Sequence, residues 1–124
     1  MARILVADDD AHIVRVMSIW LTRHGHEVLP VRNGREALDT LRMLPVDLVI
    51  SDMNMPELDG IGFVKAVREN LCRELPIMLL TARCDQDRLG QVLEGYNVRI
   101  YSKPFLPSQI VSEINELLRP ASKP

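Results

Sequence analysis

The sequence predicts an α/β fold with a doubly wound, five-stranded parallel sheet, so that helices cover both of its faces. Short apolar runs alternate with amphipathic stretches along the whole chain, which is the pattern of repeated βα units. The most apolar runs lack a polar face, as expected of strands that are covered on both sides. A chain of 124 residues has the length of one domain. We therefore expect one open sheet with right-handed crossovers.

Five segments have the composition of strands, and three of them are almost continuously apolar. The second and the fifth contain more polar residues, which suits positions at the edges of the sheet. The predicted strands are Arg3–Ala7, Glu27–Val31, Val46–Ser51, Pro76–Thr81 and Val98–Ser102. Together with the helices, they define one predicted domain over residues 1–119. Residues 120–124 are predicted to form a frayed tail or the start of a linker.

Between the strands, apolar residues recur at three- and four-residue steps, as on the buried side of an amphipathic helix. Gly25 is a natural stop for the first helix, and Pro107 suits the first turn of the last one. Gly90, inside the fourth helix, lowers its intrinsic helicity by about 1 kcal/mol relative to alanine. Asn97, before the last strand, can take the left-handed conformation that glycine often supplies. The predicted helices are Ala11–His24, Gly34–Met43, Gly60–Leu71, Asp85–Glu94 and Pro107–Leu118.

The composition argues against several classes of protein. Fifteen basic against 17 acidic side chains give a formal charge of −2, which argues against binding nucleic acid through a broad basic surface. No apolar run approaches the ~18 residues of a membrane helix, and the N-terminus lacks the apolar stretch of a signal peptide. Cys72 and Cys84 have neither metal-ligand spacing nor a disulfide framework. We therefore expect a cytoplasmic protein that binds no membrane.

Polar residues that can carry chemistry follow four of the predicted strands. In a parallel sheet, the carboxyl ends of the strands meet at one edge, and ligands bind there. Carboxylates at close range repel one another unless a cation lies between them, and an oxygen-rich, water-accessible site suits Mg²⁺. One carboxylate could then attack phosphorus and form an acyl phosphate while the metal and a lysine neutralise the developing charge. These residues are Asp8, Asp9 and Asp10 after the first strand, Asp52 and Asn54 after the third, Thr81 at the end of the fourth and Lys103 after the fifth.

Four short motifs together resemble a known family. They are an acidic pair in Val6–Asp10, an aspartate strand with Met-Pro and Asp-Gly in its loop in Leu48–Gly60, a Thr-Ala pair in Leu80–Ala82 and a Lys-Pro pair in Lys103–Phe105. Because the four motifs occur together in this order and at this spacing, the chain resembles a two-component response-regulator receiver domain over residues 4–118. The resemblance implies a flavodoxin-like (βα)₅ fold of the chemotaxis-regulator kind, with strand order 2-1-3-4-5.

The resemblance also implies a function and a metal site. Asp52 would accept a phosphoryl group from a histidine kinase or a histidine phosphotransfer protein. Mg²⁺, or Mn²⁺ in its place, would be bound by Asp8, Asp9, Asp52 and the backbone carbonyl of Asn54. Such a protein is a switch that catalyses only its own phosphorylation and dephosphorylation, and it is not an enzyme with a separate substrate.

The resemblance also implies which residues respond to phosphorylation and pass the change to the protein surface. Thr81 would hydrogen-bond the phosphoryl group and move toward it, Lys103 would pair with a phosphoryl oxygen, and the bond to Pro104 would be cis. The family usually has an aromatic residue where this chain has Ile100, and Tyr101 faces the other side of the strand. We therefore expect Thr81, with Ile100 and Tyr101 in this altered arrangement, to provide the switch. The contacts that change would involve the surface formed by the fourth helix, the fifth strand and the fifth helix.

Other interpretations of these residues remain open. One of the first three aspartates, most simply Asp10, is expected to cap the first helix. Asp8 and Asp10 also have the spacing of nucleophile and acid in an Mg²⁺-dependent phosphatase, although we expect no segment that could cover such a site. A docking module with an inactive pocket is a third alternative. We expect either a protein that works alone through protein contacts or a receiver domain separated from its output domain. The sequence predicts neither the kinase nor the downstream target.

Overall fold

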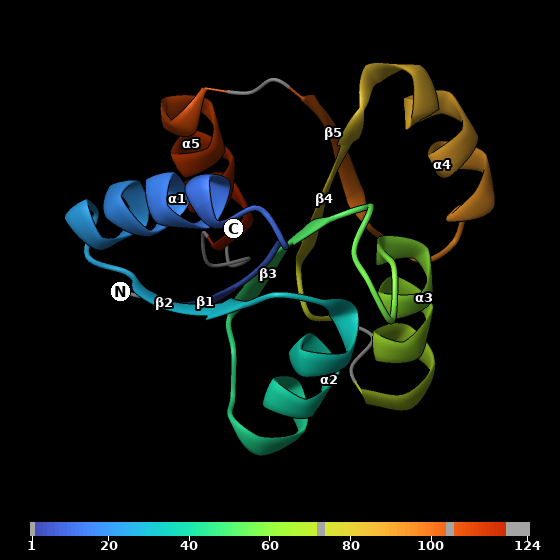
Figure 1. The fold of residues 1–124 in the computed structure, drawn as a ribbon, viewed down its shortest axis with the longest axis horizontal. Coiled ribbons are helices and arrows are strands. Elements are labelled where there is room, and N and C mark those ends of the chain that lie inside the picture. Colours follow the sequence, from blue (N-terminus) through green and yellow to red (C-terminus); the bar gives the residue numbers. More distant parts are fainter. Residues whose placement is uncertain (1, 72–73, 104–105, 119–124) are drawn as a thin grey trace, which may run out of the picture.

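The computed structural model describes residues 2–71, 74–103 and 106–118, and its five strands form one parallel sheet with helices on both faces (Figure 1). The strand order is β2-β1-β3-β4-β5, as predicted, so the two more polar strands lie at the edges. The strands are β1 (Arg3–Ala7), β2 (Glu27–Val31), β3 (Leu48–Asp52), β4 (Ile77–Ala82) and β5 (Arg99–Lys103). The helices are α1 (Ala11–Arg23), α2 (Gly34–Met43), α3 (Gly60–Ala66), α4 (Gln86–Val92) and α5 (Pro107–Leu118), with a π-helix η1 (Val67–Leu71) after α3 and a 3₁₀ turn η2 (Arg83–Asp85) before α4.

The sheet divides the hydrophobic core into two layers. α1 and α5 cover one face of the sheet, and α2, α3 and α4 cover the other (Figure 1). Along β1, Ile4 and Val6 pack in the layer under α1 and α5, whereas Leu5 and Ala7 pack in the opposite layer. All four side chains are at most 1% exposed. This two-sided burial is the reason why the strand lacks a polar face in the sequence.

The predicted helix at Gly60–Leu71 is only partly correct. It is α-helical as far as Ala66 and continues as the π-helix η1. The wider turn of a π-helix places the consecutive residues Val67 and Arg68 both in the interior, where they are 0% and 7% exposed. Arg68 then donates from Nε and Nη2 to the backbone carbonyls of Tyr96 and Asn97. Tertiary contacts therefore override the α-helical pattern at this point.

The predicted helix at Asp85–Glu94 is also shorter in the structure. Asp85 is the last residue of a 3₁₀ turn and forms no side-chain cap, and α4 begins only at Gln86. Gly95, at φ = +89°, lies beyond the end of α4. Asn97 has φ = +56°, which confirms the left-handed conformation expected there. The observed strands begin and end within two residues of the predicted limits. The small shifts have a consequence for the site, because Asp52 and Lys103 are the last residues of their strands and do not follow them.

Two predictions fall on parts of the chain that the structure leaves out of its description. These are the cis peptide bond at Pro104 and the tail at residues 120–124. In the described part of the chain, no helix has both the length and the apolar character needed to cross a membrane.

Candidate functional site

Three carboxylates meet at the carboxyl end of the sheet, where the sequence predicts them. Asp8 and Asp9 follow β1, and Asp52 ends β3. These strands are neighbours with Ala7 opposite Ser51, so the residues that come next along each strand are also close. Carboxylate oxygens of Asp8, Asp9 and Asp52 all lie within 4.8 Å of one another. Asp8 and Asp52 are buried whereas Asp9 is exposed, so the cluster is open to solvent on one side.

Lys103 places a positive charge beside this cluster. Its Nζ lies 2.7 Å from Oδ1 of Asp52 and 3.9 Å from Oδ2 of Asp8. The first contact is a charge-assisted hydrogen bond, and the second is an ion pair too long for a hydrogen bond. The side chain of Asp52 is only 9% exposed, so water screens its pair with the lysine less than it screens a surface pair. Lys103 therefore orients the Asp52 carboxylate and offsets part of the negative charge.

Burial raises the pKa of Asp8 from its ordinary value of 3.8 to about 6. The charges of Asp52 and Asp9 act in the same direction. The backbone N–H of Asp10, which donates to Asp8 Oδ1 at 2.9 Å, and the ammonium group of Lys103 act against it. The site therefore disfavours the ionised form of Asp8 relative to an exposed carboxylate, and further positive charge would offset this cost.

Two buried oxygen atoms of the site have no hydrogen-bond partner among the described residues. They are Oδ2 of Asp8 and Oγ1 of Thr81. Thr81 is 1% exposed and follows Leu80 in β4, which is the residue opposite Asp52. An unsatisfied buried polar atom costs about 1–3 kcal/mol, so these two atoms indicate where a ligand would complete the site.

The donor atoms of the site fit a hard divalent cation. The atoms that converge are carboxylate oxygens, and Mg²⁺ prefers oxygen ligands, whereas softer metals prefer nitrogen and sulfur. The buried Oδ2 of Asp8 lacks a donor, and the exposed Asp9 leaves room for metal-bound water. The residues present are therefore suited to Mg²⁺.

The segment after Asp52 returns closely to the end of its strand. The N–H of Gly60 donates to the carbonyl of Met53 at 2.8 Å. A Cβ atom on Gly60 would lie 2.6 Å from Cδ1 of Leu79 and 2.9 Å from Cα of Met53, so this approach requires glycine. The intervening loop, which includes the exposed Asn54, therefore starts and closes at the residue that follows Asp52.

Asp10 caps α1, as predicted. Its Oδ1 accepts hydrogen bonds from the backbone N–H groups of His12 at 2.9 Å and Ile13 at 3.4 Å. Among the described acidic residues, Asp10 does not belong to the group whose oxygens converge. The geometry therefore argues against a phosphatase that uses Asp8 and Asp10 as nucleophile and acid.

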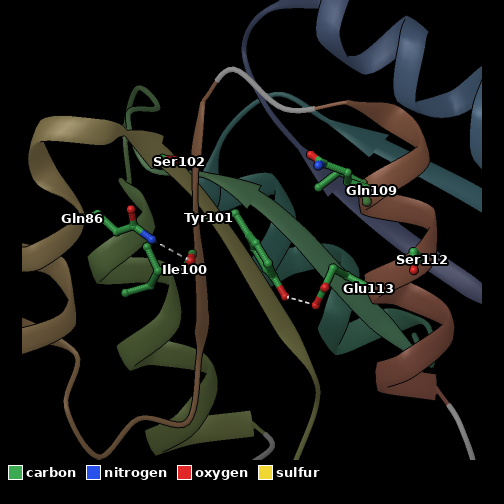
Figure 2. Close-up of a pocket in the computed structure, with 8 residues that line it drawn as sticks. Gln86, Ile100, Tyr101, Ser102, Gln109, Ser112 and Glu113 are labelled. Atoms are coloured by element: carbon green, nitrogen blue, oxygen red, sulfur yellow. Dashed lines mark hydrogen bonds between the residues drawn. The ribbon is translucent and has the colours of Figure 1, made fainter.

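Ile100 and Tyr101 lie on opposite faces of β5, as predicted. Ile100 packs in the layer under α2, α3 and α4, whereas Tyr101 packs in the layer under α1 and α5. The hydroxyl of Tyr101 donates to Oε1 of Glu113 in α5 at 2.7 Å (Figure 2). Burial, together with this hydrogen bond, raises the pKa of Tyr101 to about 12. Nε2 of Gln86, the first residue of α4, donates to the carbonyl of Ile100 at 3.3 Å, so β5 is tied to both α4 and α5.

Comparisons with known proteins agree with this geometry. The family model for the response regulator receiver domain matches residues 4–115. The chain is 38% identical over 122 residues to the probable transcriptional regulator ycf27 of Porphyra purpurea, and the match covers 98% of this chain and 49% of that protein. The chain spans about half the length of the curated relatives it matches.

Two solved structures are similar in both fold and sequence. The chemotaxis response regulator CheY4 of Vibrio cholerae gives a TM-score of 0.87 at 33% identity, covering 95% of this chain and 99% of that chain. The response regulator protein TrrA of Thermotoga maritima, solved in complex with Mg(2+)-BeF, gives a TM-score of 0.82 at 28% identity, covering 95% of this chain and 100% of that chain.

Proposed function

The chain belongs to the response regulator receiver domain family, and we propose from this that Asp52 accepts a phosphoryl group and that the modified protein changes its contacts with a partner. Members of this family act in two-component systems and bind Mg²⁺ through acidic residues. The proposed donor is a phosphohistidine of a histidine kinase or of a histidine phosphotransfer protein. The observation that carries the proposal is the meeting of Asp8, Asp9 and Asp52 within 4.8 Å, with Lys103 2.7 Å from Asp52.

In the proposed reaction, a carboxylate oxygen of Asp52 attacks phosphorus. The new O–P bond forms as the P–N bond to the donor histidine breaks, and the electron pair leaves with the imidazole, which takes a proton from water. The product is an acyl phosphate on Asp52. Lys103 first orients the carboxylate and then pairs with a phosphoryl oxygen. Thr81, whose hydroxyl has no partner among the described residues, donates to another phosphoryl oxygen.

The proposed ligands of Mg²⁺, or of Mn²⁺ in its place, are the side chains of Asp8, Asp9 and Asp52 and the backbone carbonyl of Asn54. A cation is needed because three carboxylates and one lysine leave an excess of negative charge, which repels a phosphoryl group. When bound, the metal neutralises charge on the phosphoryl oxygens. The unpartnered Oδ2 of Asp8 supports a ligand at this position.

The proposed readout begins at Thr81 and reaches the surface through β5. Thr81 lies opposite Ser102 in the neighbouring strand, so its movement toward a phosphoryl group would disturb β5. The Gln86–Ile100 and Tyr101–Glu113 hydrogen bonds would pass this change to α4 and α5. These residues line a groove of about 400 Å³ on the surface formed by α4, β5 and α5 (Figure 2). We propose that this surface contacts a downstream protein or an output domain of the same protein.

The function is tested by locating the modified aspartate. The protein is incubated with acetyl phosphate and Mg²⁺, reduced with borohydride and digested, and the labelled peptide is identified by mass spectrometry. We expect the label on Asp52. A label on Asp8 would instead indicate a phosphatase with its nucleophile on the first strand. Absence of label with both acetyl phosphate and a phosphohistidine protein would indicate a docking module, and either result contradicts the proposal.

A further inference from the structure

The loop between β3 and α3, residues 53–59, is supported by an element that is distant in the sequence. We call these residues the acceptor loop because they follow Asp52. The backbone N–H of Gly34, the first residue of α2, donates to the carbonyl of Leu58 at 3.2 Å. Nδ2 of Asn33 donates to Oε2 of Glu57 at 3.3 Å. The start of α2 therefore holds the acceptor loop through one backbone and one side-chain hydrogen bond.

Asn33 uses its two polar atoms for two different contacts. Its Oδ1 accepts a hydrogen bond from the N–H of Glu36 at 2.8 Å and caps α2. Its Nδ2 makes the bond to Glu57, and the residue is only 7% exposed. Aspartate would provide the same helix cap, but it would place a second carboxylate against Glu57. The helix cap needs only a side-chain oxygen, whereas the contact with the acceptor loop needs the amide nitrogen.

The contact is close, and the acceptor loop is held in a strained conformation. A Cβ atom on Gly34 would lie 2.4 Å from the carbonyl oxygen of Leu58, so α2 begins directly against the backbone of the loop. Glu57 has φ = +67°, which is unfavourable for a residue with a side chain. The hydrogen bond from Nδ2 of Asn33 ends on the side chain of this same residue.

We propose that Asn33 is a positioning residue for the phosphorylation site. By holding Glu57, it fixes the acceptor loop, and with it the backbone of Asn54, beside the three carboxylates. This inference rests on the proposed function, in which the carbonyl of Asn54 is a metal ligand. A loop that is already ordered loses less conformational freedom when the ion binds, so its supporting residues raise metal affinity without touching the metal.

The test separates the loop contact from the helix cap. Asn33→Asp keeps the cap and removes the donor to Glu57, whereas Glu57→Gln keeps an acceptor and is the matched control. In the double variant the amide and the carboxylate exchange places, which restores both the hydrogen bond and the net charge. We expect Asn33→Asp to weaken Mg²⁺ binding about tenfold in calorimetric titration, and the double variant to recover it. In the metal-free protein, amide hydrogen exchange in residues 53–59 should rise in Asn33→Asp and return in the double variant.

Several outcomes would overturn the inference. Unchanged loop exchange and Mg²⁺ affinity in Asn33→Asp, or no recovery in the double variant, would show that Asn33 is only a helix cap. Glu57→Ala removes the acceptor from an exposed position, so it tests the same contact if Asn33→Asp does not fold, and it should give the same increase in loop exchange. A wild-type protein that binds no Mg²⁺ would contradict the proposed function, whereas exchange in the metal-free loop still decides the role of Asn33.

Discussion

Replacement of Asp52 by asparagine is expected to lower the rate of phosphorylation by at least about a thousandfold, because an amide cannot act as the nucleophile. The side chain keeps its shape, and its oxygen can still accept the hydrogen bond that Lys103 now makes at 2.7 Å. The variant should therefore fold like the wild type. The measurement is the fraction of intact protein that carries a phosphoryl group after incubation with acetyl phosphate and Mg²⁺, followed over time by mass spectrometry.

The matched control for this variant is Asp10→Asn. It removes a carboxylate from the same edge of the sheet, but asparagine caps helices as well as aspartate does, so α1 remains capped. Because Asp10 does not belong to the convergent cluster, its variant should be phosphorylated at the wild-type rate. If Asp52→Asn were modified as fast as this control, Asp52 would not be the phosphoacceptor.

The sheet and the convergence of the site were predictable because they depend on simple physical rules. Ile4 and Leu5 are both apolar since β1 is covered on both faces, and this pattern is visible in the sequence of the strand itself. Asp8 and Asp52 meet because parallel strands end at the same edge. The same rule placed Lys103 nearby, although the length of its side chain is what allows it to reach from β5 past β4 to Asp52.

The features that were not predicted depend on partners far away along the chain. The end of α3 becomes a π-helix where Arg68 reaches the carbonyls of Tyr96 and Asn97, which are almost thirty residues further on. Asn33 is a similar case, since local sequence indicates only a helix cap. An Asn-Gly pair at the start of a helix was the available signal, but nothing near it in the sequence indicates that its amide meets Glu57. Such contacts follow from the tertiary structure and not from local preference.

The second large effect is expected from Asp8→Asn, which should stabilise the metal-free protein and remove its stabilisation by Mg²⁺. Burial raises the pKa of the wild-type side chain to about 6, so the side chain is ionised at neutral pH. Its ionisation then lowers the free energy of unfolding by roughly 3 kcal/mol relative to a protein in which Asp8 is neutral. Asparagine is neutral at every pH, and its oxygen can still accept the hydrogen bond from the N–H of Asp10. We therefore expect the free energy of unfolding in EDTA to rise by about 2–3 kcal/mol at neutral pH.

The dependence of this difference on pH follows from the direction of the pKa shift. Because the folded-state pKa of Asp8 lies above the unfolded value of 3.8, protonation of Asp8 favours the folded state. That contribution is complete below about pH 3.8 and is lost as the pH rises through about 6. Urea unfolding in EDTA should therefore give similar free energies of unfolding for wild type and Asp8→Asn near pH 3.8. As the pH rises above this value, the free energy of unfolding of the variant should increasingly exceed that of the wild type.

Mg²⁺ should reverse the order of the two proteins above about pH 6, because it stabilises the ionised carboxylate of the wild type only. The same ion should raise the melting temperature of the wild type less at lower pH, since protons then compete for Asp8. Asp9→Asn is the control: it removes an exposed carboxylate of the cluster, so it should weaken Mg²⁺ binding with little gain in metal-free stability. An Asp8→Asn protein that unfolds like the wild type in EDTA, or that Mg²⁺ stabilises equally well, would mean that the buried carboxylate is neither costly nor a ligand.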